Sequence, residues 1–178
     1  MIPDNFSSDD AVYTGFMKRQ YAEAAALAGE SDLLRIEPSP VIPPHFVAEY
    51  RCKGLVRQPD GGIVETDRFQ IGIWFPPDYL RRVDPFDILR FFGPRNVWHP
   101  NISDQAPFIC IGRLAPGTPL VDILYQCFDI ITYHKFNPRE DDCLNKAACA
   151  WARENRHRFP IDRRPLKGRK LDLEADRV

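Results

Sequence analysis

Seventeen prolines divide this chain of 178 residues into short segments. Proline lacks a backbone N–H and fixes φ, so it interrupts helix interiors and the central strands of a sheet. Because the prolines fall between segments with helical or strand periodicity, the sequence predicts short elements joined by stiff connections. A chain of this length is expected to form one domain and to bury roughly 70% of the surface that its unfolded form exposes.

Composition and charge exclude several classes of protein. Hydrophobic residues make up 44% of the chain and charged residues 28%, which is typical of a globular protein. The formal net charge of −1 gives no overall field that attracts nucleic acid or anionic lipid, so we expect neither as a partner. No apolar run reaches the ~20 residues of a membrane span, and the start "MIPDNFSSDD" is acidic rather than signal-like. We therefore expect a cytoplasmic protein.

The five cysteines have no paired spacing, which favours reduced thiols over a disulfide framework. Cys52, Cys127 and Cys149 fall in apolar stretches and are predicted to be small core residues. Cys110 lies two residues before Gly112, and Cys143 follows Asp141 and Asp142, so each is a candidate either for the core or for chemistry. The chain has no Cys-x-x-Cys and no His-x3-His spacing, so we expect no metal site.

The N-terminal part predicts an amphipathic helix that ends at Gly29. Ser7 or Ser8 is a candidate cap, with Asp9 and Asp10 supplying negative charge to the first turn. Apolar residues then recur every three or four positions. They are Tyr13, Phe16, Met17, Tyr21, Ala24, Leu27 and Ala28.

Four segments rich in β-branched and aromatic residues follow, over residues 33–40, 45–57, 63–75 and 86–92. The sequence "QPDGG" at 58–62 is a strong hairpin signal between the second and third of them. An antiparallel meander of four strands is the simplest topology for this order.

Two further helices are predicted after the strands. Thr118 and Pro119 provide a cap and a first-turn proline for a helix over 120–136, which is apolar on most faces and therefore expected to be buried. Asp142 is a candidate cap for a last helix that stops before Pro160. Its predicted inner residues are Leu144, Ala147, Ala148 and Trp151. The element order predicts an α+β domain.

The connection from residue 92 to residue 119 is long, and loops of this size are commonly functional. Cys110 is either a buried thiol or a nucleophile, since a few per cent of a cysteine with the reference pKa of ~8.5 is thiolate at pH 7. His99 is either a histidine satisfied by loop backbone or a base. Asn101 either caps a turn or donates to an oxyanion, which can lower a barrier by about 3–4 kcal/mol.

Four stretches of the sequence together resemble the ubiquitin-conjugating enzyme family. "FQIGIWFPPDY" (69–79) is similar to its third strand and the following Phe-Pro-x-x-Tyr loop. "HPNI" (99–102) resembles its His-Pro-Asn motif, and "ICIGRL" (109–114) resembles the segment with the active-site cysteine. "NPREDDCLNKAACAW" (137–151) is similar to the gate segment and the next helix, with Cys143 in place of a common proline.

The resemblance implies a ubiquitin-conjugating-like fold and roles for five residues. Cys110 would accept the C-terminal acyl group of ubiquitin or a ubiquitin-like protein as a thioester and pass it to an amine. His99 and Pro100 would fix the turn that presents Asn101, whose role would be oxyanion stabilisation or loop support. Asp142 would orient the incoming amine or accept its proton.

The resemblance also implies partners and a domain division. The partners would be ubiquitin or a ubiquitin-like protein, a target protein and an activating enzyme, which would contact Lys18 and Arg19; a ligase stays open. The protein would need no cofactor, because the activating enzyme consumes the ATP. Residues 1–160 would form the catalytic domain and 161–178 a loosely held charged tail. The shortened C-terminal part resembles divergent prokaryotic members, some of which belong to antiviral conjugation operons.

Two alternatives from other functional classes stay open from the sequence. The first is a non-catalytic binding module on the same fold, against which the presence of Cys110 and Asn101 argues. The second is a thiol hydrolase that pairs Cys110 with His99 or His134 and Asp142. The hydrolase requires an imidazole within ~3–4 Å of the sulfur.

Overall fold

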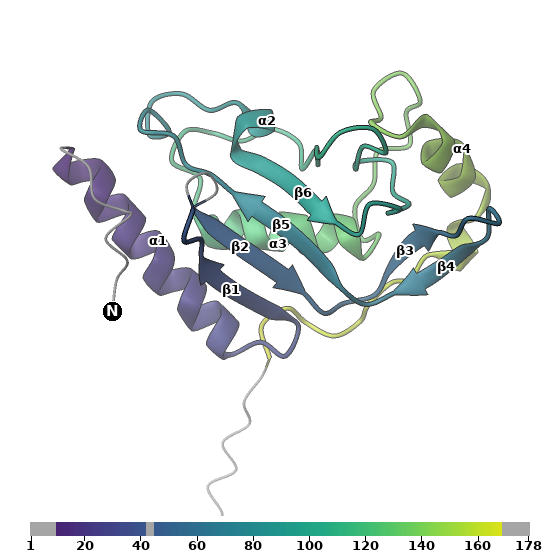
Figure 1. Cartoon of the computed structure of the whole chain (residues 1–178), viewed down its shortest axis with the longest axis horizontal. Coiled ribbons are helices and arrows are strands. Elements are labelled where there is room, and N and C mark those ends of the chain that lie inside the picture. The colour runs from purple at the N-terminus through teal and green to yellow at the C-terminus, as the bar shows by residue number, and fades with distance from the viewer. Residues whose placement is uncertain (1–9, 42–44, 169–178) are drawn as a thin grey trace, which may run out of the picture.

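The computed structural model describes residues 10–41 and 45–168, and its elements are labelled in Figure 1. It is an α+β fold with one N-terminal helix, a four-stranded antiparallel sheet and helices after the strands. In chain order the elements are α1 (Ala11–Gly29), β1 (Leu34–Pro38), β2 (Phe46–Tyr50), β3 (Gly54–Arg57), β4 (Ile63–Thr66), β5 (Phe69–Ile73), α2 (Pro85–Ile88), β6 (Leu89–Gly93), α3 (Leu120–Ile131), α4 (Lys146–Glu154) and a 3-10 turn (Arg156–Arg158).

The sheet has the strand order β1-β2-β5-β6, and β3 and β4 form a separate hairpin at its end. The predicted strands 45–57 and 63–75 are therefore each divided in two. At the first division, Lys53 donates its backbone N–H to the carboxylate of Asp162 instead of to a neighbouring strand (3.1 Å). Gly54 comes next, and a Cβ there would lie 2.3 Å from the Phe69 ring, so only glycine fits this close approach.

Helix α1 ends where the sequence predicted, at Gly29, but its cap differs from the prediction. Asp10 is the cap itself, since its carboxylate accepts hydrogen bonds from the N–H groups of Val12 and Tyr13 at 2.9 and 3.1 Å. The predicted caps, Ser7 and Ser8, lie outside the described residues.

Helix α3 is buried and begins at Leu120 as predicted, but its predicted cap and its predicted end are both wrong. Its cap position is Pro119, which makes no side-chain cap bond, while the hydroxyl of Thr118 bonds to Ala115. The helix ends at Ile131 instead of residue 136, and Tyr133 follows with a φ of 59°. A residue in the left-handed conformation cannot continue an α-helix. The helix therefore ends before the apolar sequence pattern does.

Two other predicted boundaries are wrong because side-chain caps decide them. The predicted strand over 86–92 begins as the short helix α2, whose first turn is capped by Asp84 through the N–H of Phe86 (2.9 Å). Asp142 does not cap α4. Asn145 does, accepting from the N–H of Ala148 at 2.9 Å, and Ala147 is exposed instead of facing inward.

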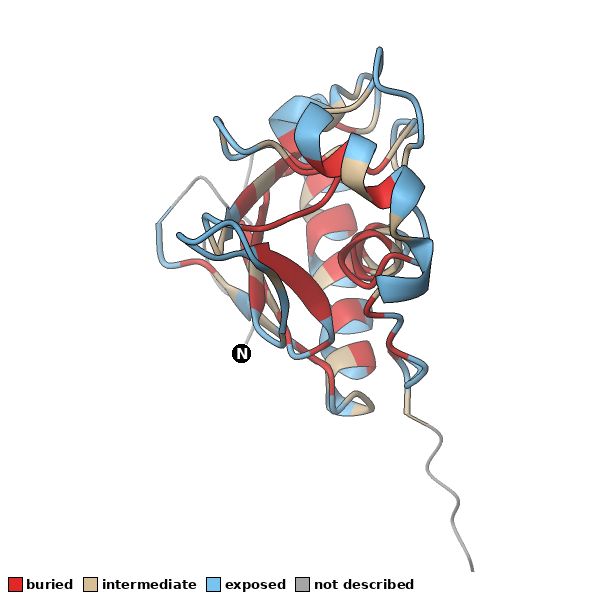
Figure 2. Cartoon of the chain, turned by 90° about the vertical axis from the view of Figure 1, so that its right-hand side faces the viewer, coloured by how far each residue is buried: buried red, intermediate tan, exposed pale blue. Residues whose placement is uncertain are grey.

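The main core lies between the four-stranded sheet and α3, which crosses behind it, while α1 packs against α3 and β1 (Figure 1). Figure 2 shows the buried residues gathered on the facing sides of these elements. A second, smaller cluster joins the β3–β4 hairpin to α4. It consists of Leu55, Trp98, Tyr133, Ala148 and Ala152, with Ile63, Phe136, Trp151 and Phe159 partly buried around it. This second cluster supports the segment that begins at Trp98.

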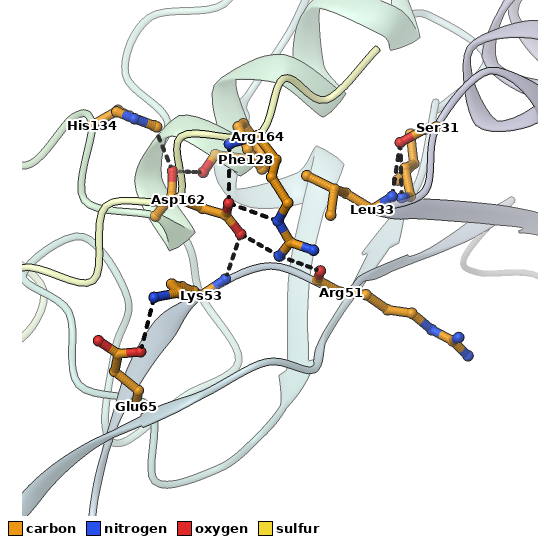
Figure 3. Close-up of polar contacts among 11 residues, drawn as sticks. Ser31, Leu33, Arg51, Lys53, Glu65, Phe128, His134, Asp162 and Arg164 are labelled. Carbon is orange, nitrogen blue, oxygen red and sulfur yellow. Dashed lines mark hydrogen bonds and ion pairs between the residues drawn. The ribbon is translucent and has the colours of Figure 1, made fainter. Parts of the chain in front are cut away.

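Residues 159–168, which we call the C-terminal strap, lie against the body of the protein. Leu166 is buried in the main core, and the backbone N–H of Gly168 donates to the carbonyl of Glu30 at 2.8 Å. The carboxylate of Asp162 is 3% exposed and accepts from Lys53 and from the backbone and side chain of Arg164 (Figure 3). The first part of the predicted loose tail is thus held tightly, whereas 169–178 lie outside the described residues.

Candidate active site

Cys110 lies in a loop of residues 99–112, which we call the active-site loop. Its neighbours Ile109 and Ile111 are buried, and a single bridge pairs Ile109 with Ile102. Cys110 itself is partly exposed, and its backbone N–H donates to the carbonyl of Asn101 at 2.8 Å. Because two buried residues flank it, the cysteine has a fixed backbone and an accessible thiol.

The Asn101 side chain joins the active-site loop to a second segment. Its Nδ2 donates to the carbonyl of Cys110 at 2.9 Å, and its Oδ1 accepts from the backbone N–H of Asn137 at 2.8 Å. Both backbone polar groups of Cys110 therefore bond to Asn101. This geometry fits the loop-support role directly, and an amide Nδ2 carries a second hydrogen that the bond to Cys110 does not use.

His99 and Pro100 hold the turn that presents Asn101. Nδ1 of His99 accepts from the N–H of Asn101 at 3.0 Å, and burial lowers the pKa of His99 to about 3. The ring is therefore neutral at physiological pH, with its proton on Nε2. The carbonyl of Pro100 accepts from the backbone N–H groups of Leu144 and Asn145 at 2.9 and 3.2 Å, which connects the turn to the start of α4.

Asp142 is connected to the same network through Asn137. Nδ2 of Asn137 donates to the backbone carbonyl of Asp142 at 3.1 Å and to its Oδ2 at 3.2 Å. Asp142 is exposed, and no described residue donates a hydrogen bond to its Oδ1. Sequence reasoning did not single out Asn137, although the Asn-Pro step at 137–138 is a turn signal that marks it.

Lys135 is a second residue that the sequence did not single out. Its Nζ donates to the carbonyl of Ile111 at 2.9 Å, and a Cβ on Gly112 would lie 3.4 Å from that nitrogen. Gly112 has a φ of 101°, which favours glycine. Lys135 thus holds the Ile111–Gly112 peptide and places a positive charge at the active-site loop.

The two predicted hydrolase bases are not at the thiol. Nε2 of His99 is buried with no hydrogen-bond partner among the described residues, and Nδ1 is used by Asn101. His134 lies beside the C-terminal strap, where Nδ1 is 2.8 Å from the hydroxyl of Thr132 (Figure 3). Within the described ranges no histidine hydrogen-bonds to Cys110, so this geometry lacks the base of a thiol hydrolase.

The remaining predicted positions lie elsewhere. Lys18 and Arg19 are on the exposed face of α1, with Nε of Arg19 4.0 Å from the Glu23 carboxylate. Their role as an activating-enzyme contact stays a prediction. Cys52, Cys127 and Cys149 are buried as predicted, and all five cysteines are free thiols.

The described part of the chain holds neither a metal-binding cluster nor a helix that could span a membrane. Residues 10–41 and 45–168 contain no group of three or more His, Cys, Asp or Glu side chains placed to hold a metal ion. None of their helices is both long and apolar enough to cross a lipid bilayer.

No protein-family model matches the chain, whereas a curated protein and solved structures resemble it. A curated relative from Arabidopsis thaliana, named "Probable ubiquitin-conjugating enzyme E2 31", is 30% identical over 111 residues, which are 62% of this chain and 68% of the relative. A crystal structure assigned to a ubiquitin conjugating enzyme from Plasmodium yoelii has a TM-score of 0.51 at 20% identity, covering 79% of this chain and 85% of that chain. A ubiquitin conjugating enzyme domain from Toxoplasma gondii has a TM-score of 0.49 at 21% identity, covering 79% of this chain and 89% of that chain. The Plasmodium likeness shows a shared fold.

Proposed function

The chain belongs to the ubiquitin-conjugating enzyme family, and we propose that it carries ubiquitin or a ubiquitin-like protein as a thioester on Cys110 and transfers it to an amine of a target protein. The observation that carries the proposal is the double contact of Asn101 with Cys110. One asparagine bonds to both the N–H and the carbonyl of this partly exposed cysteine. The same asparagine is connected through Asn137 to Asp142, so the three predicted residues belong to one network.

The first proposed step loads Cys110. Its thiolate attacks the carbonyl carbon of the thioester that the activating enzyme holds, a new C–S bond forms, and the thiolate of the activating enzyme leaves. The negative charge that develops on the carbonyl oxygen needs a hydrogen-bond donor. The unused N–H of the Asn101 amide is a candidate donor, and Lys135 adds a positive charge at the same loop.

The second proposed step transfers the acyl group to a lysine of the target. The neutral amine attacks the thioester carbonyl, the C–N bond forms, the C–S bond breaks, and the amine loses one proton. A lysine with a pKa of ~10.4 is neutral only about once in a thousand at pH 7.4. Burial of the amine against the enzyme would raise that fraction, while the exposed Asp142 would orient the amine or accept its proton through Oδ1.

The partners follow from the proposed reaction. An activating enzyme consumes ATP and supplies the thioester, and Lys18 and Arg19 are the proposed contact with it. The chain itself needs no cofactor for acyl transfer. A ligase requirement and a place in a bacterial antiviral conjugation pathway stay predictions from the sequence resemblance, and the three relatives named above come from eukaryotes.

A charging assay tests the proposal. The protein is incubated with ATP, ubiquitin and a ubiquitin-activating enzyme, and the products are run on non-reducing gels. We expect an adduct that a thiol reductant removes and that Cys110→Ala abolishes. Cys143→Ala is the matched control, because Cys143 is the other partly exposed thiol, and it should charge normally.

A negative result has a defined meaning. If panels of ubiquitin-like proteins with their charged activating enzymes give no adduct on the wild-type chain, the transferase proposal is wrong. An adduct that persists in Cys110→Ala would mean that another cysteine carries the thioester, which would contradict the assignment of Cys110 as the nucleophile.

A further inference from the structure

Two cysteines outside the proposed mechanism meet at residues 137–145, which we call the gate segment. Cys143 is partly exposed and lies in the segment itself, whereas Cys149 is buried in α4. The Cys143 thiol donates to the carbonyl of Glu140 and the Cys149 thiol to the carbonyl of Asn137, both at 3.5 Å. After burial, the neighbouring Cys143 thiol is the next cause that raises the pKa of Cys149. Both thiols therefore bond to the same short loop, the partly exposed Cys143 from within it and the buried Cys149 from α4.

An ion pair joins the two segments that carry these cysteines. Arg153 follows Cys149 by one helical turn, so both side chains lie on the same face of α4. Its guanidinium is 2.9 Å from the Glu140 carboxylate, which ties the gate segment to the helix. Arg153 also places a positive charge near Cys149, which opposes but does not overcome the effect of burial on the pKa of that thiol.

The two thiols differ in the order in which they can react. Burial raises the pKa of Cys149 to about 11, so this thiol is protonated at neutral pH and solvent does not reach it. Cys143 is the accessible one and meets a dissolved oxidant first. An exposed thiol with a second thiol behind it is the usual arrangement of a reversible redox pair.

We propose that a peroxide converts Cys143 and Cys149 into a reversible disulfide, and that this disulfide slows acyl transfer from Cys110. One peroxide oxygen adds to the Cys143 sulfur, giving a sulfenic acid and one water. The Cys149 sulfur then attacks it, the S–S bond forms, the S–O bond breaks, and the second water leaves with the Cys149 proton. The two thiols lose two electrons and the peroxide gains them; a small dithiol reverses the step.

The effect on transfer follows from the contacts that the disulfide removes. Both thiol hydrogen bonds to the gate segment are lost, including the bond to the carbonyl of Asn137. Asn137 holds both Asn101 and Asp142, and Asp142 directly precedes Cys143. A new cross-link between residues 143 and 149 therefore acts on the loop that carries the proposed amine-orienting carboxylate. This second part rests on the proposed function, whereas disulfide formation does not.

The disulfide is tested on the protein alone. A Cys110→Ala variant is treated with equimolar hydrogen peroxide, alkylated and digested. We expect a mass loss of about 2 Da and one linked peptide pair containing Cys143 and Cys149. Cys149→Ser should abolish it, and Cys127, a buried cysteine, should stay reduced as an internal control. Direct overoxidation of Cys143, or dimers linked through it, in place of the internal pair would overturn the proposal.

The effect of the disulfide on acyl transfer is tested in a single-turnover experiment. The wild-type chain is charged first, because acylation protects the Cys110 sulfur, and is then oxidised and mixed with free lysine. We expect discharge at least about tenfold slower than in the oxidised Cys143→Ser variant, since small displacements of positioning groups cost this much. Equal rates, with the disulfide present, would overturn the regulatory part. Failure to charge before oxidation would contradict the proposed function and leave the mass result standing.

Discussion

The active-site loop and the C-terminal strap each bury one titratable side chain, and they keep it in opposite charge states. In the loop, His99 is 1% exposed, has no ionic partner and is held neutral, with its pKa lowered to about 3 by burial. In the strap, Asp162 is 3% exposed and stays charged, because hydrogen bonds from Arg164 lower its pKa to about 2. Burial favours the neutral form of any group, and a charged group stays charged only where donors replace its water.

The two regions therefore have different tasks: the active-site loop positions the Cys110 thiol, and the strap stabilises the fold. Asn101 holds the Cys110 backbone through uncharged amide groups, so the position of the cysteine depends on directional hydrogen bonds. The strap instead uses one carboxylate to hold the bend at Lys53 and the guanidinium of Arg164 at once. We therefore expect changes in the loop to affect catalysis and changes in the strap to affect stability.

Removing the charge of the strap should produce the largest effect. Asp162→Ala leaves the backbone N–H of Lys53 and the guanidinium of Arg164 without their acceptor, which should lower the free energy of unfolding by about 3 kcal/mol. Urea unfolding measures it. Asp141→Ala is the matched control, because Arg139 makes the same two-point contact with an exposed Asp141, and no measurable change is expected. An equal loss of unfolding free energy in both variants would contradict the special role assigned to the buried Asp162.

Removing the amide of Asn101 tests the neutral side of the comparison. Asn101→Ala loses the bonds to the Cys110 carbonyl and to the Asn137 N–H, so transfer to lysine should slow about a hundredfold. The control is Asn96→Ala, which removes one exposed asparagine bond to the carbonyl of Arg57. Single-turnover discharge of the charged protein gives both rates. Normal transfer by Asn101→Ala would mean that the network does not position the thioester.

Acid should weaken the two regions in different pH windows. The pKa of His99 is about 3 in the folded state and ~6.5 in the unfolded state. Its contribution to the free energy of unfolding is therefore complete above pH 6.5 and decreases by about 2 kcal/mol between pH 6.5 and 5. His45, whose pKa burial lowers to about 4, adds to the same slope. The contribution of Asp162 to the free energy of unfolding is complete above the pKa of ~3.9 that this group has in the unfolded state, and it is lost as the pH falls towards 2.

Urea titrations at pH 7, 5 and 3.5 separate these windows. His99→Gln should reduce the loss between pH 7 and 5, and Asp162→Asn should reduce only the loss below pH 4. If His99→Gln unfolds with the wild-type slope between pH 7 and 5, the histidine is not held neutral by the fold.

The smallest effect is expected from removing the charge of Asp142, which is exposed. Asp142→Asn keeps the shape of the side chain and its backbone bond to Asn137 but removes the proton acceptor, so lysine transfer should slow up to about tenfold with charging unchanged. Asp141→Asn, on the neighbouring exposed aspartate, is the control and should transfer normally. Unchanged transfer by Asp142→Asn at every pH would remove Asp142 from the mechanism.

The sequence alone was sufficient for the order of the main helices and of the strands that form the sheet. Helical spacing, alternating strands and turn residues such as "QPDGG" depend on near neighbours in the chain, and they predicted α1, the hairpin and the buried α3. The His-Pro-Asn step and Cys110 can be recognised in the sequence for the same reason: a rigid turn and a thiol are local features.

Only the tertiary structure decided which groups hold that segment and which charges are buried. The contacts from Asn101 to Asn137 and from Lys53 to Asp162 join residues 36 and 109 positions apart, which no local pattern records. The same limit explains the wrong helix starts, since Asn145 and not Asp142 meets the first N–H groups of α4. Local periodicity specifies which face of an element is apolar; which distant polar group completes a buried hydrogen bond is fixed only when the elements pack together.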